Sequence, residues 1–142
     1  MAPTPQLLIE DSLRAGGHRV TPQRLAIAAV VRDFGGHATA EQVYTAVAER
    51  MPGVSLPTVY ATLELLEELG LVRRVATEGT TAVYDPRTEE HHHLVCRACG
   101  AIADVDGAVD PGEIMRVARA GGFAPDGAQV VIRGLCGACR TG

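Results

Sequence analysis

Tryptophan and lysine are both absent from this sequence, and only 4% of its 142 residues are aromatic. Any hydrophobic core must therefore consist mainly of Leu, Val, Ile and Ala. No apolar run approaches the roughly 20 residues that a membrane-spanning helix needs. The opening segment, Met1-Ala-Pro-Thr-Pro5, lacks the charged and apolar regions of a secretory signal. We therefore expect a cytoplasmic protein with no membrane partner.

The charged residues argue both against and for binding to nucleic acid. The formal net charge is −4, whereas domains that bind phosphate backbones usually carry a basic excess. All 13 basic side chains, however, are arginines, which bind phosphate and guanine through paired hydrogen bonds. A few well-placed arginines can therefore suffice, although a GC-rich genome would produce the same preference without functional meaning.

Helix signals dominate the first half of the chain. Apolar spacing predicts four helices, three of them opened by the N-cap residues Thr21, Thr39 and Ser55. The predicted helices cover residues 7–15, 21–34, 39–50 and 55–69.

Two short strands are predicted next, at residues 71–76 and 81–84. Several helices followed by a two-stranded hairpin are typical of a winged helix, in which the helix before the hairpin enters the major groove of DNA. That helix, residues 55–69, also carries Glu64, Glu67 and Glu68. These carboxylates would repel phosphate unless they face away from it.

The pattern changes after the polar segment 85–90, which is typical of a linker. Strands are predicted at residues 93–96, 101–105 and 129–134, with a short helix at 111–120. The second half is therefore a small α/β unit. A unit of about 50 residues is too small to be stable without a metal or a partner subunit.

Four cysteines form two CxxC pairs, Cys96-Arg-Ala-Cys99 and Cys136-Gly-Ala-Cys139. Thiols stay reduced in the cytoplasm, so such pairs indicate metal ligands before disulfides. Four thiolates complete the tetrahedral shell of Zn²⁺ and leave no open position, which predicts a structural zinc site. The alternative, a thioredoxin-like redox pair, needs one CxxC at the start of a helix, and neither pair offers that.

Three consecutive histidines precede the first cysteine pair. Alternate residues of an extended segment point the same way, so His91 and His93 can share an ion while His92 faces elsewhere. Taken alone, a histidine pair of this kind is more often the polar edge of a strand.

Four segments together resemble the ferric uptake regulator (Fur) superfamily over nearly the whole chain. They are Arg19-Val-Thr-Pro-Gln-Arg24, Ser55-Leu-Pro-Thr-Val-Tyr60 followed by Leu63 and Gly70-Leu-Val72, His91-His-His-Leu-Val-Cys96-Arg-Ala-Cys99-Gly100, and Cys136-Gly-Ala-Cys139. The resemblance implies an α+β fold: a winged helix-turn-helix DNA-binding domain at residues 1–84, a hinge at 85–92, and an α/β dimerisation and metal-binding domain at 93–142. It also implies a homodimeric transcriptional repressor, not an enzyme, that binds palindromic double-stranded operator DNA.

The resemblance further implies a regulatory metal held by residues of both domains. Its ligands would be His37, Asp85, His91, His93 and Asp104. Three imidazoles and two carboxylates suit Fe²⁺ or Mn²⁺. A shell that is complete only when the domains close favours the closed arrangement, and in a dimer this sets the spacing of the two recognition helices.

Aspartate at positions 85 and 104 most resembles the peroxide-sensing, PerR-like branch of the superfamily. That branch implies oxidation of His37 or His91 by peroxide at bound Fe²⁺, after which the closed state is lost. An iron, manganese or nickel uptake regulator without peroxide sensing is the alternative. A zinc-stabilised metalloenzyme using His91 and His93 is a further hypothesis, but it lacks an evident general acid or base beside an open metal site.

The resemblance also suggests which residues contact DNA. Tyr60 is predicted to contact a base, with Thr58 near phosphate, and Arg19 and Arg24 at the backbone or minor groove. Packing within the helix is the alternative role of Tyr60. Ala61 stands where relatives often have a polar or basic side chain, so one base contact is expected to be missing.

Overall fold

The computed structural model describes residues 2–75, 81–88, 91–105 and 110–141. Parts of the predicted wing (76–80) and hinge (89–90) lie outside these ranges. The chain divides into two compact units, Met1–Thr88 and Glu89–Gly142, and each is described by itself. The first unit is mainly helical and the second is built on a sheet, so the predicted α+β class is confirmed. Among the described residues, no helix is long and apolar enough to cross a membrane.

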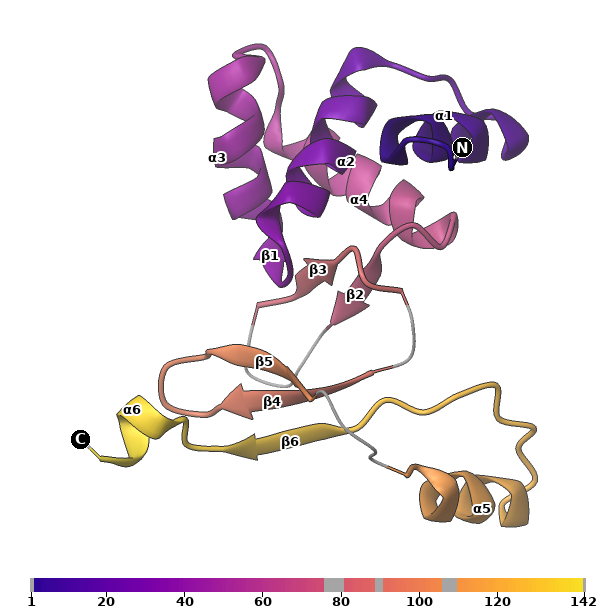
Figure 1. Ribbon diagram of the computed structural model, residues 1–142, viewed down its shortest axis with the longest axis vertical. Coiled ribbons are helices and arrows are strands. Elements are labelled where there is room, and N and C mark those ends of the chain that lie inside the picture. Colours follow the sequence, from indigo (N-terminus) through magenta and orange to yellow (C-terminus); the bar gives the residue numbers. More distant parts are fainter. Residues whose placement is uncertain (1, 76–80, 89–90, 106–109, 142) are drawn as a thin grey trace. The chain divides into compact units, whose positions relative to one another are not determined.

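Four helices make up most of the first unit (Figure 1). They are α1 (Pro5–Ala15), α2 (Pro22–Phe34), α3 (Ala40–Arg50) and α4 (Leu56–Glu68). Each begins behind a hydroxyl N-cap whose oxygen accepts a backbone N–H, and the caps include the three predicted from sequence. The core lies between α2, α3 and α4, with Ile27, Val43 and Leu63 fully buried.

A small antiparallel sheet completes the first unit. Its strands are β1 (Ala38–Thr39), β2 (Arg73–Val75) and β3 (Val83–Asp85), in the order β1-β3-β2. The sequence predicted β2 and β3 but not β1, which is only two residues long. The register pairs Ala38 with Tyr84, and therefore aligns His37 with Asp85.

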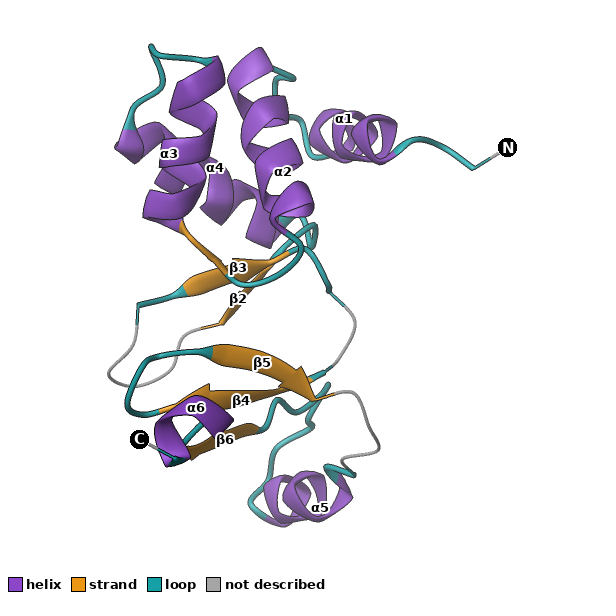
Figure 2. Cartoon of the chain, turned by 60° about the vertical axis from the view of Figure 1, so that its left-hand side comes forward, coloured by secondary structure: helices purple, strands orange, loops and turns teal. Residues whose placement is uncertain are grey.

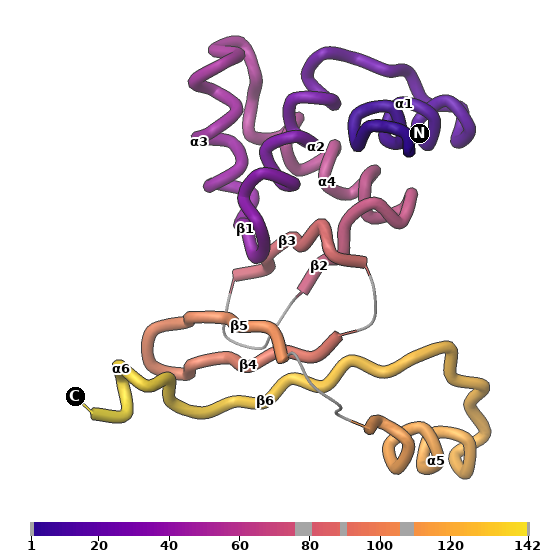
Figure 3. The backbone as a smooth tube through the Cα atoms, in the orientation of Figure 1, coloured from indigo at the N-terminus to yellow at the C-terminus, as the bar shows by residue number. Residues whose placement is uncertain are grey.

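The second unit is a three-stranded sheet with two helices (Figure 2). Strand β4 (His92–Cys96) is central, antiparallel to β5 (Ile102–Val105) and parallel to β6 (Val131–Gly134). Helix α5 spans Gly112–Ala120, and the four-residue helix α6, Gly137–Arg140, was not predicted. Because β4 and β6 run in the same direction, the segments that follow them lie at the same end of the sheet (Figure 3).

One face of this sheet is apolar and exposed. Leu94 of β4 pairs with Ala103 of β5 and with Ile132 of β6, so the three side chains share one face. Leu94 and Ile132 are 44% and 47% exposed. Helix α5 has no buried residue at all, and its Ile114 and Val117 are also exposed. Exposed apolar side chains gathered on one face of a sheet are typical of an interaction surface.

Candidate metal centres and nucleic-acid interface

All four cysteines gather at one end of the second unit's sheet. Cys96 ends β4 and Cys99 lies in the following turn, while Cys136 caps α6 and Cys139 lies within it. The sequence-based expectation that neither pair stands at the start of a helix is therefore wrong for the second pair, because the four-residue helix α6 was not predicted. Their four sulfur atoms lie within 4.8 Å of one another, and Sγ of Cys99 is 3.8 Å from Sγ of Cys136. Four bonds of about 2.3 Å to a tetrahedral ion place sulfurs about 3.8 Å apart. The cluster therefore has the spacing of a four-thiolate metal site, for which Zn²⁺ is the usual ion.

The backbone around this cluster favours thiolate at one position. The N–H of Cys136 donates to Sγ of Cys96 at 3.4 Å, and this bond, with the backbone N–H groups of Cys99 and Ala98, lowers the pKa of Cys96 to about 6. Hydrogen bonds with the neighbouring thiols, that of Cys136 foremost, raise the pKa of Cys139 to about 12. Four adjacent sulfurs thus lose all their protons readily only when a cation balances the charge.

The turn between Cys96 and Cys99 depends on a glycine. The N–H of Gly100 donates to the carbonyl of Cys96 at 2.9 Å, which closes the turn. Gly100 has a φ of +75°, a left-handed conformation that side chains disfavour. This glycine therefore lets the chain fold both thiols of the pair toward one point.

The first unit holds two of the five predicted regulatory ligands. His37 precedes β1 and Asp85 ends β3, and the strand register aligns them. Nε2 of His37 is 3.4 Å from Oδ2 of Asp85. The other carboxylate oxygen, Oδ1, accepts the backbone N–H of Arg87 at 2.8 Å, which fixes the orientation of the carboxylate.

The second unit holds the other three predicted ligands. His91 and His93 present Nε2 to the same atom, Oδ1 of Asp104, and each distance is 3.4 Å. His93 pairs directly with Asp104 across β4 and β5. The two imidazole rings are 4.5 Å apart between centroids. Both histidines are buried, and Asp104 is three-quarters buried.

These two sets of side chains have the spacing of metal ligands. Ligand atoms about 2.1 Å from an ion stand roughly 3.0–3.4 Å apart, depending on the geometry. All three imidazole–carboxylate distances are 3.4 Å, longer than an ordinary hydrogen bond. The donors are nitrogen and oxygen without sulfur, a set that fits Fe²⁺ or Mn²⁺.

His92 differs from its two neighbours. Its Nδ1 accepts the backbone N–H of Val130 at 2.9 Å, so it is tied to the chain that precedes β6. The expectation that His92 faces away from His91 and His93 agrees with the alternation of side chains along β4.

Three of the four predicted DNA-contacting residues line one cavity of the first unit. The cavity measures about 340 Å³, and Arg19, Arg24 and Thr58 lie in its wall with Thr62. It lies at the N-terminal ends of α2 and α4, where backbone N–H groups favour anions. The Arg24 guanidinium donates to the carbonyl of Arg19 at 2.5 Å, and the Thr58 hydroxyl is 2.8 Å from that of Ser55. The arrangement can accept a phosphate group.

Tyr60, the fourth predicted DNA residue, is on the exposed side of α4. Its side chain is 38% exposed, and its hydroxyl donates to Oε1 of Glu41 on α3 at 2.7 Å. The same hydrogen bond lowers the pKa of Glu41 and raises that of Tyr60. Packing in the core, the alternative role, does not describe this side chain. No local sequence signal indicates Glu41 as the partner of Tyr60, because the two residues are 19 positions apart.

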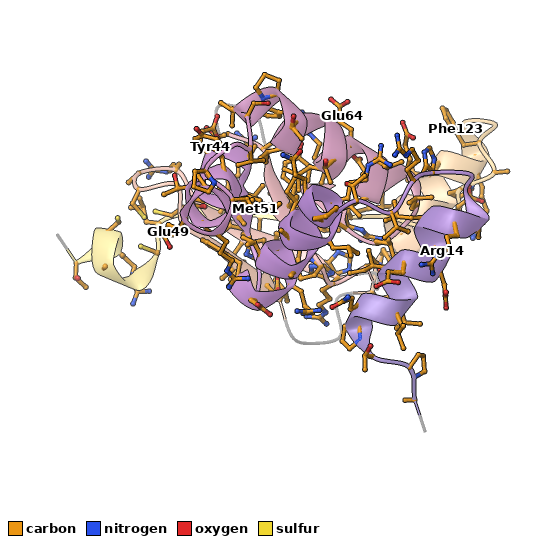
Figure 4. The ribbon with its side chains drawn as sticks, turned by 90° about the horizontal axis from the view of Figure 1, so that it is seen from above. Arg14, Tyr44, Glu49, Met51, Glu64 and Phe123 are labelled. Carbon is orange, nitrogen blue, oxygen red and sulfur yellow. The ribbon has the colours of Figure 1, made fainter. Side chains whose placement is uncertain are left out.

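The three glutamates of α4 are all exposed. Figure 4 shows Glu64 projecting outward from the helix. Glu64 and Glu67 line a second cavity of about 310 Å³ together with Tyr60, Arg74 and Tyr84. The acidic side chains are thus separate from the cavity that contains Arg19 and Arg24.

The first unit carries a capped helix, α4, packed on a helical core, and the second is a small β-domain with four clustered cysteines. Together these features are those of a metal-responsive transcriptional regulator of the winged-helix class. Comparison with known families agrees: the model of the Ferric uptake regulator family matches residues 15–132. The chain belongs to the ferric uptake regulator family. It is therefore a transcriptional regulator and not an enzyme.

Individual relatives cover most of the chain. Ferric uptake regulation protein 1 of Mycolicibacterium fortuitum is 44% identical over 84% of this chain and 74% of its own length. Transcriptional regulator FurA of Mycobacterium tuberculosis is 40% identical over 91% of this chain and 88% of its own. The crystal structure of the Vibrio cholerae ferric uptake regulator superposes with a TM-score of 0.74, at 27% identity, covering 89% of this chain and 98% of that one.

The comparisons do not favour the predicted peroxide-sensing branch. The Peroxide-responsive repressor PerR of Staphylococcus epidermidis is 34% identical over 66% of this chain and 62% of its own length. This is a lower identity over a shorter span than for the two relatives above. The branch prediction rested on the aspartates at positions 85 and 104 alone. Sequence identity over most of the chain is stronger evidence for the branch than these two residues.

Proposed function

We propose that this chain is an Fe²⁺- or Mn²⁺-responsive repressor of metal uptake that binds palindromic operator DNA as a homodimer. The name of the Mycolicibacterium fortuitum relative, Ferric uptake regulation protein 1, supports iron as the signal. The observation that carries the proposal is the repeated 3.4 Å spacing of imidazole nitrogen and carboxylate oxygen, found once in the first unit and twice in the second.

Each unit alone offers an incomplete ligand set. His37 and Asp85 supply one nitrogen and one carboxylate, while His91, His93 and Asp104 supply two nitrogens and another carboxylate. Fe²⁺ and Mn²⁺ commonly take about six nitrogen and oxygen donors. We therefore propose that one ion takes ligands from both sets, and that its binding energy favours the arrangement of the units that fits the operator.

The four-cysteine cluster has a different role in this proposal. Its ligand set is closed, so an ion there would stabilise the fold and would not respond to solution metal. Zn²⁺ is the proposed occupant. The exposed apolar face of Leu94 and Ile132, together with α5, is the proposed dimer surface, because a second copy would bury it.

The experiment measures DNA binding with and without metal. Operator sequences are first selected from a random palindromic library in the presence of Mn²⁺, and binding is then followed by fluorescence anisotropy. We expect His37→Ala and His93→Ala to remove the Mn²⁺ dependence, while His18→Ala, outside both ligand sets, retains it. Wild-type binding that is unchanged by a chelator that spares the zinc would refute the proposal.

Peroxide sensing is tested separately by peptide mass spectrometry. The chain is loaded with Fe²⁺ without oxygen and exposed to stoichiometric peroxide, with Mn²⁺-loaded protein as the control. For a metal-uptake regulator we expect the peptides containing His37 and His91 to remain unmodified while the protein still binds DNA. One added oxygen on either peptide, with iron only, would instead make this chain a peroxide sensor.

A further inference from the structure

Gln129 lies against one of the proposed regulatory ligands. Its carboxamide nitrogen Nε2 is 2.9 Å from Nδ1 of His93, and His93 is completely buried. The two residues are 36 positions apart in the sequence. They meet because β6 pairs in parallel with β4, with His93 opposite Val131 and the N–H of His93 bonded to the carbonyl of Val130.

The position of one proton on His93 decides whether it can bind a metal. A neutral imidazole carries its proton on Nδ1 or on Nε2, and only the nitrogen without a proton can act as a ligand. Nε2 of His93 faces Oδ1 of Asp104. Metal binding through this atom therefore requires the proton on Nδ1, the nitrogen that faces Gln129.

A carboxamide can serve either tautomer, because a half-turn about its last side-chain bond exchanges its donor and acceptor ends. When Nε2 of Gln129 donates, Nδ1 of His93 accepts, and the proton of His93 points from Nε2 toward Asp104. When Oε1 of Gln129 faces the ring, the proton resides on Nδ1 and Nε2 offers a lone pair.

We propose that Gln129 is a positioning residue that sets the tautomer of His93, and that its carboxamide turns over when a divalent cation binds. The inference rests on the proposed role of His93 as a metal ligand. Partners behind a ligating histidine commonly fix its tautomer and change metal affinity when they are lost.

The partner of His92, unlike that of His93, cannot exchange a donor for an acceptor. Its Nδ1 accepts a backbone N–H, that of Val130, and a peptide N–H can only donate. Neutral His92 therefore keeps its proton on Nε2 permanently. Two consecutive residues, Gln129 and Val130, thus contact two consecutive histidines, but only the side-chain contact can reverse its polarity.

The test uses the full chain with its cysteine cluster loaded with zinc. Gln129→Glu can only accept a hydrogen bond, whereas Gln129→Met can neither donate nor accept. Long-range ¹H–¹⁵N spectra of the metal-free protein should place the proton of His93 on Nε2 in the wild type and on Nδ1 in Gln129→Glu. The Mn²⁺ affinity should be highest in Gln129→Glu, lower in the wild type and lowest in Gln129→Met, with steps of about tenfold.

Ala124→Glu is the matched control, because it adds the same charge to the same exposed segment and should change neither measurement. An unchanged His93 tautomer in Gln129→Glu would overturn the inference, as would equal weakening of Mn²⁺ binding by the Glu and Met variants. If His93→Ala keeps the full Mn²⁺ affinity, the proposed function fails, whereas the tautomer measurement on metal-free protein still decides the role of Gln129.

Discussion

The hydroxyl of Tyr60 on α4 donates a hydrogen bond to the carboxylate of Glu41 on α3 at 2.7 Å. This contact connects the proposed recognition helix to its neighbour at the exposed surface. It also holds the polar end of the tyrosine against a negative charge. The ring of Tyr60 is then the part of the side chain that remains available to a base, and apolar contact with a thymine methyl is a recognised form of base reading.

The substitution Tyr60→Phe removes the hydroxyl and keeps the aromatic ring, so it distinguishes the roles of the two groups. If the ring contacts the base, operator affinity should change little in Tyr60→Phe, whereas Tyr60→Ala should lose about 1–3 kcal/mol, the usual size of one base contact. Competition with operator variants measures both the affinity and the base preference. Equal losses in the two variants would assign the contact to the hydroxyl.

The same hydrogen bond predicts a pH effect. It lowers the pKa of Glu41 in the folded protein, so its contribution to stability is present above the unfolded pKa and disappears as the pH falls through the lowered value. In Tyr60→Phe the pKa of Glu41 should rise toward the ordinary value of a glutamate. An NMR titration of the Glu41 carboxyl carbon measures this directly, and an unchanged pKa would show that the contact is absent in solution.

Arg19 lies in the wall of the cavity at the N-terminal ends of α2 and α4. If it contacts phosphate, Arg19→Ala should weaken binding to all sequences equally and reduce the slope of log affinity against log salt by about one. Arg14→Ala is the matched control, because Arg14 is exposed on α1 and paired with Glu10 and Asp11 (Figure 4). A change in base preference instead of the slope would contradict a phosphate contact.

Cys99→Ser should remove one ligand of the thiol cluster. Among the described residues of the second unit, few outside β4 are buried, and domains this small usually need a metal or a partner to be stable. We expect loss of bound zinc and of the β-sheet signal in circular dichroism, while the helical signal of the first unit persists. Ala98→Ser, one residue away, should leave both unchanged, and a Cys99→Ser protein with full zinc content would disprove a structural role.

Ile132→Glu places a charge on the exposed apolar face, beside Leu94 of the central strand. A buried carboxylate without a partner opposes association, so the variant should sediment as a monomer where the wild type sediments as a dimer. Arg50→Glu, exposed at the end of α3 in the other unit, should remain dimeric. If Ile132→Glu stays dimeric, the apolar face is not the dimer surface.

Most of the helices were predicted correctly from local sequence signals. Thr21, Thr39 and Ser55 cap the helices they were expected to cap, because a cap depends only on the next three residues. Strand β1 was missed because two residues show no alternation, and α6 was missed because four residues show no helical period. Yet β1 is the element that aligns His37 with Asp85.

Residue types could be predicted at the candidate sites, but their partners could not. The four cysteines form a recognisable spacing, and the cluster they make follows from it. The contacts of Gln129 with His93 and of Tyr60 with Glu41 span 36 and 19 residues. Such contacts depend on strand register and helix packing, which short sequence windows do not contain.

The parallel pairing of β4 with β6 has a mechanical consequence. Side chains of a strand alternate between faces, so a slip of β6 by one residue would reverse every side chain on it. The cysteine cluster is attached to β6 at Cys136, two residues beyond Gly134, the partner of Cys96. Because the cluster holds that end of β6, it prevents the slip. It therefore also preserves the strand register at the opposite end, where Gln129 and Val130 contact the histidines. Loss of the metal at the cysteine end of the sheet would thus misalign Gln129 and Val130 with the histidines at the other end.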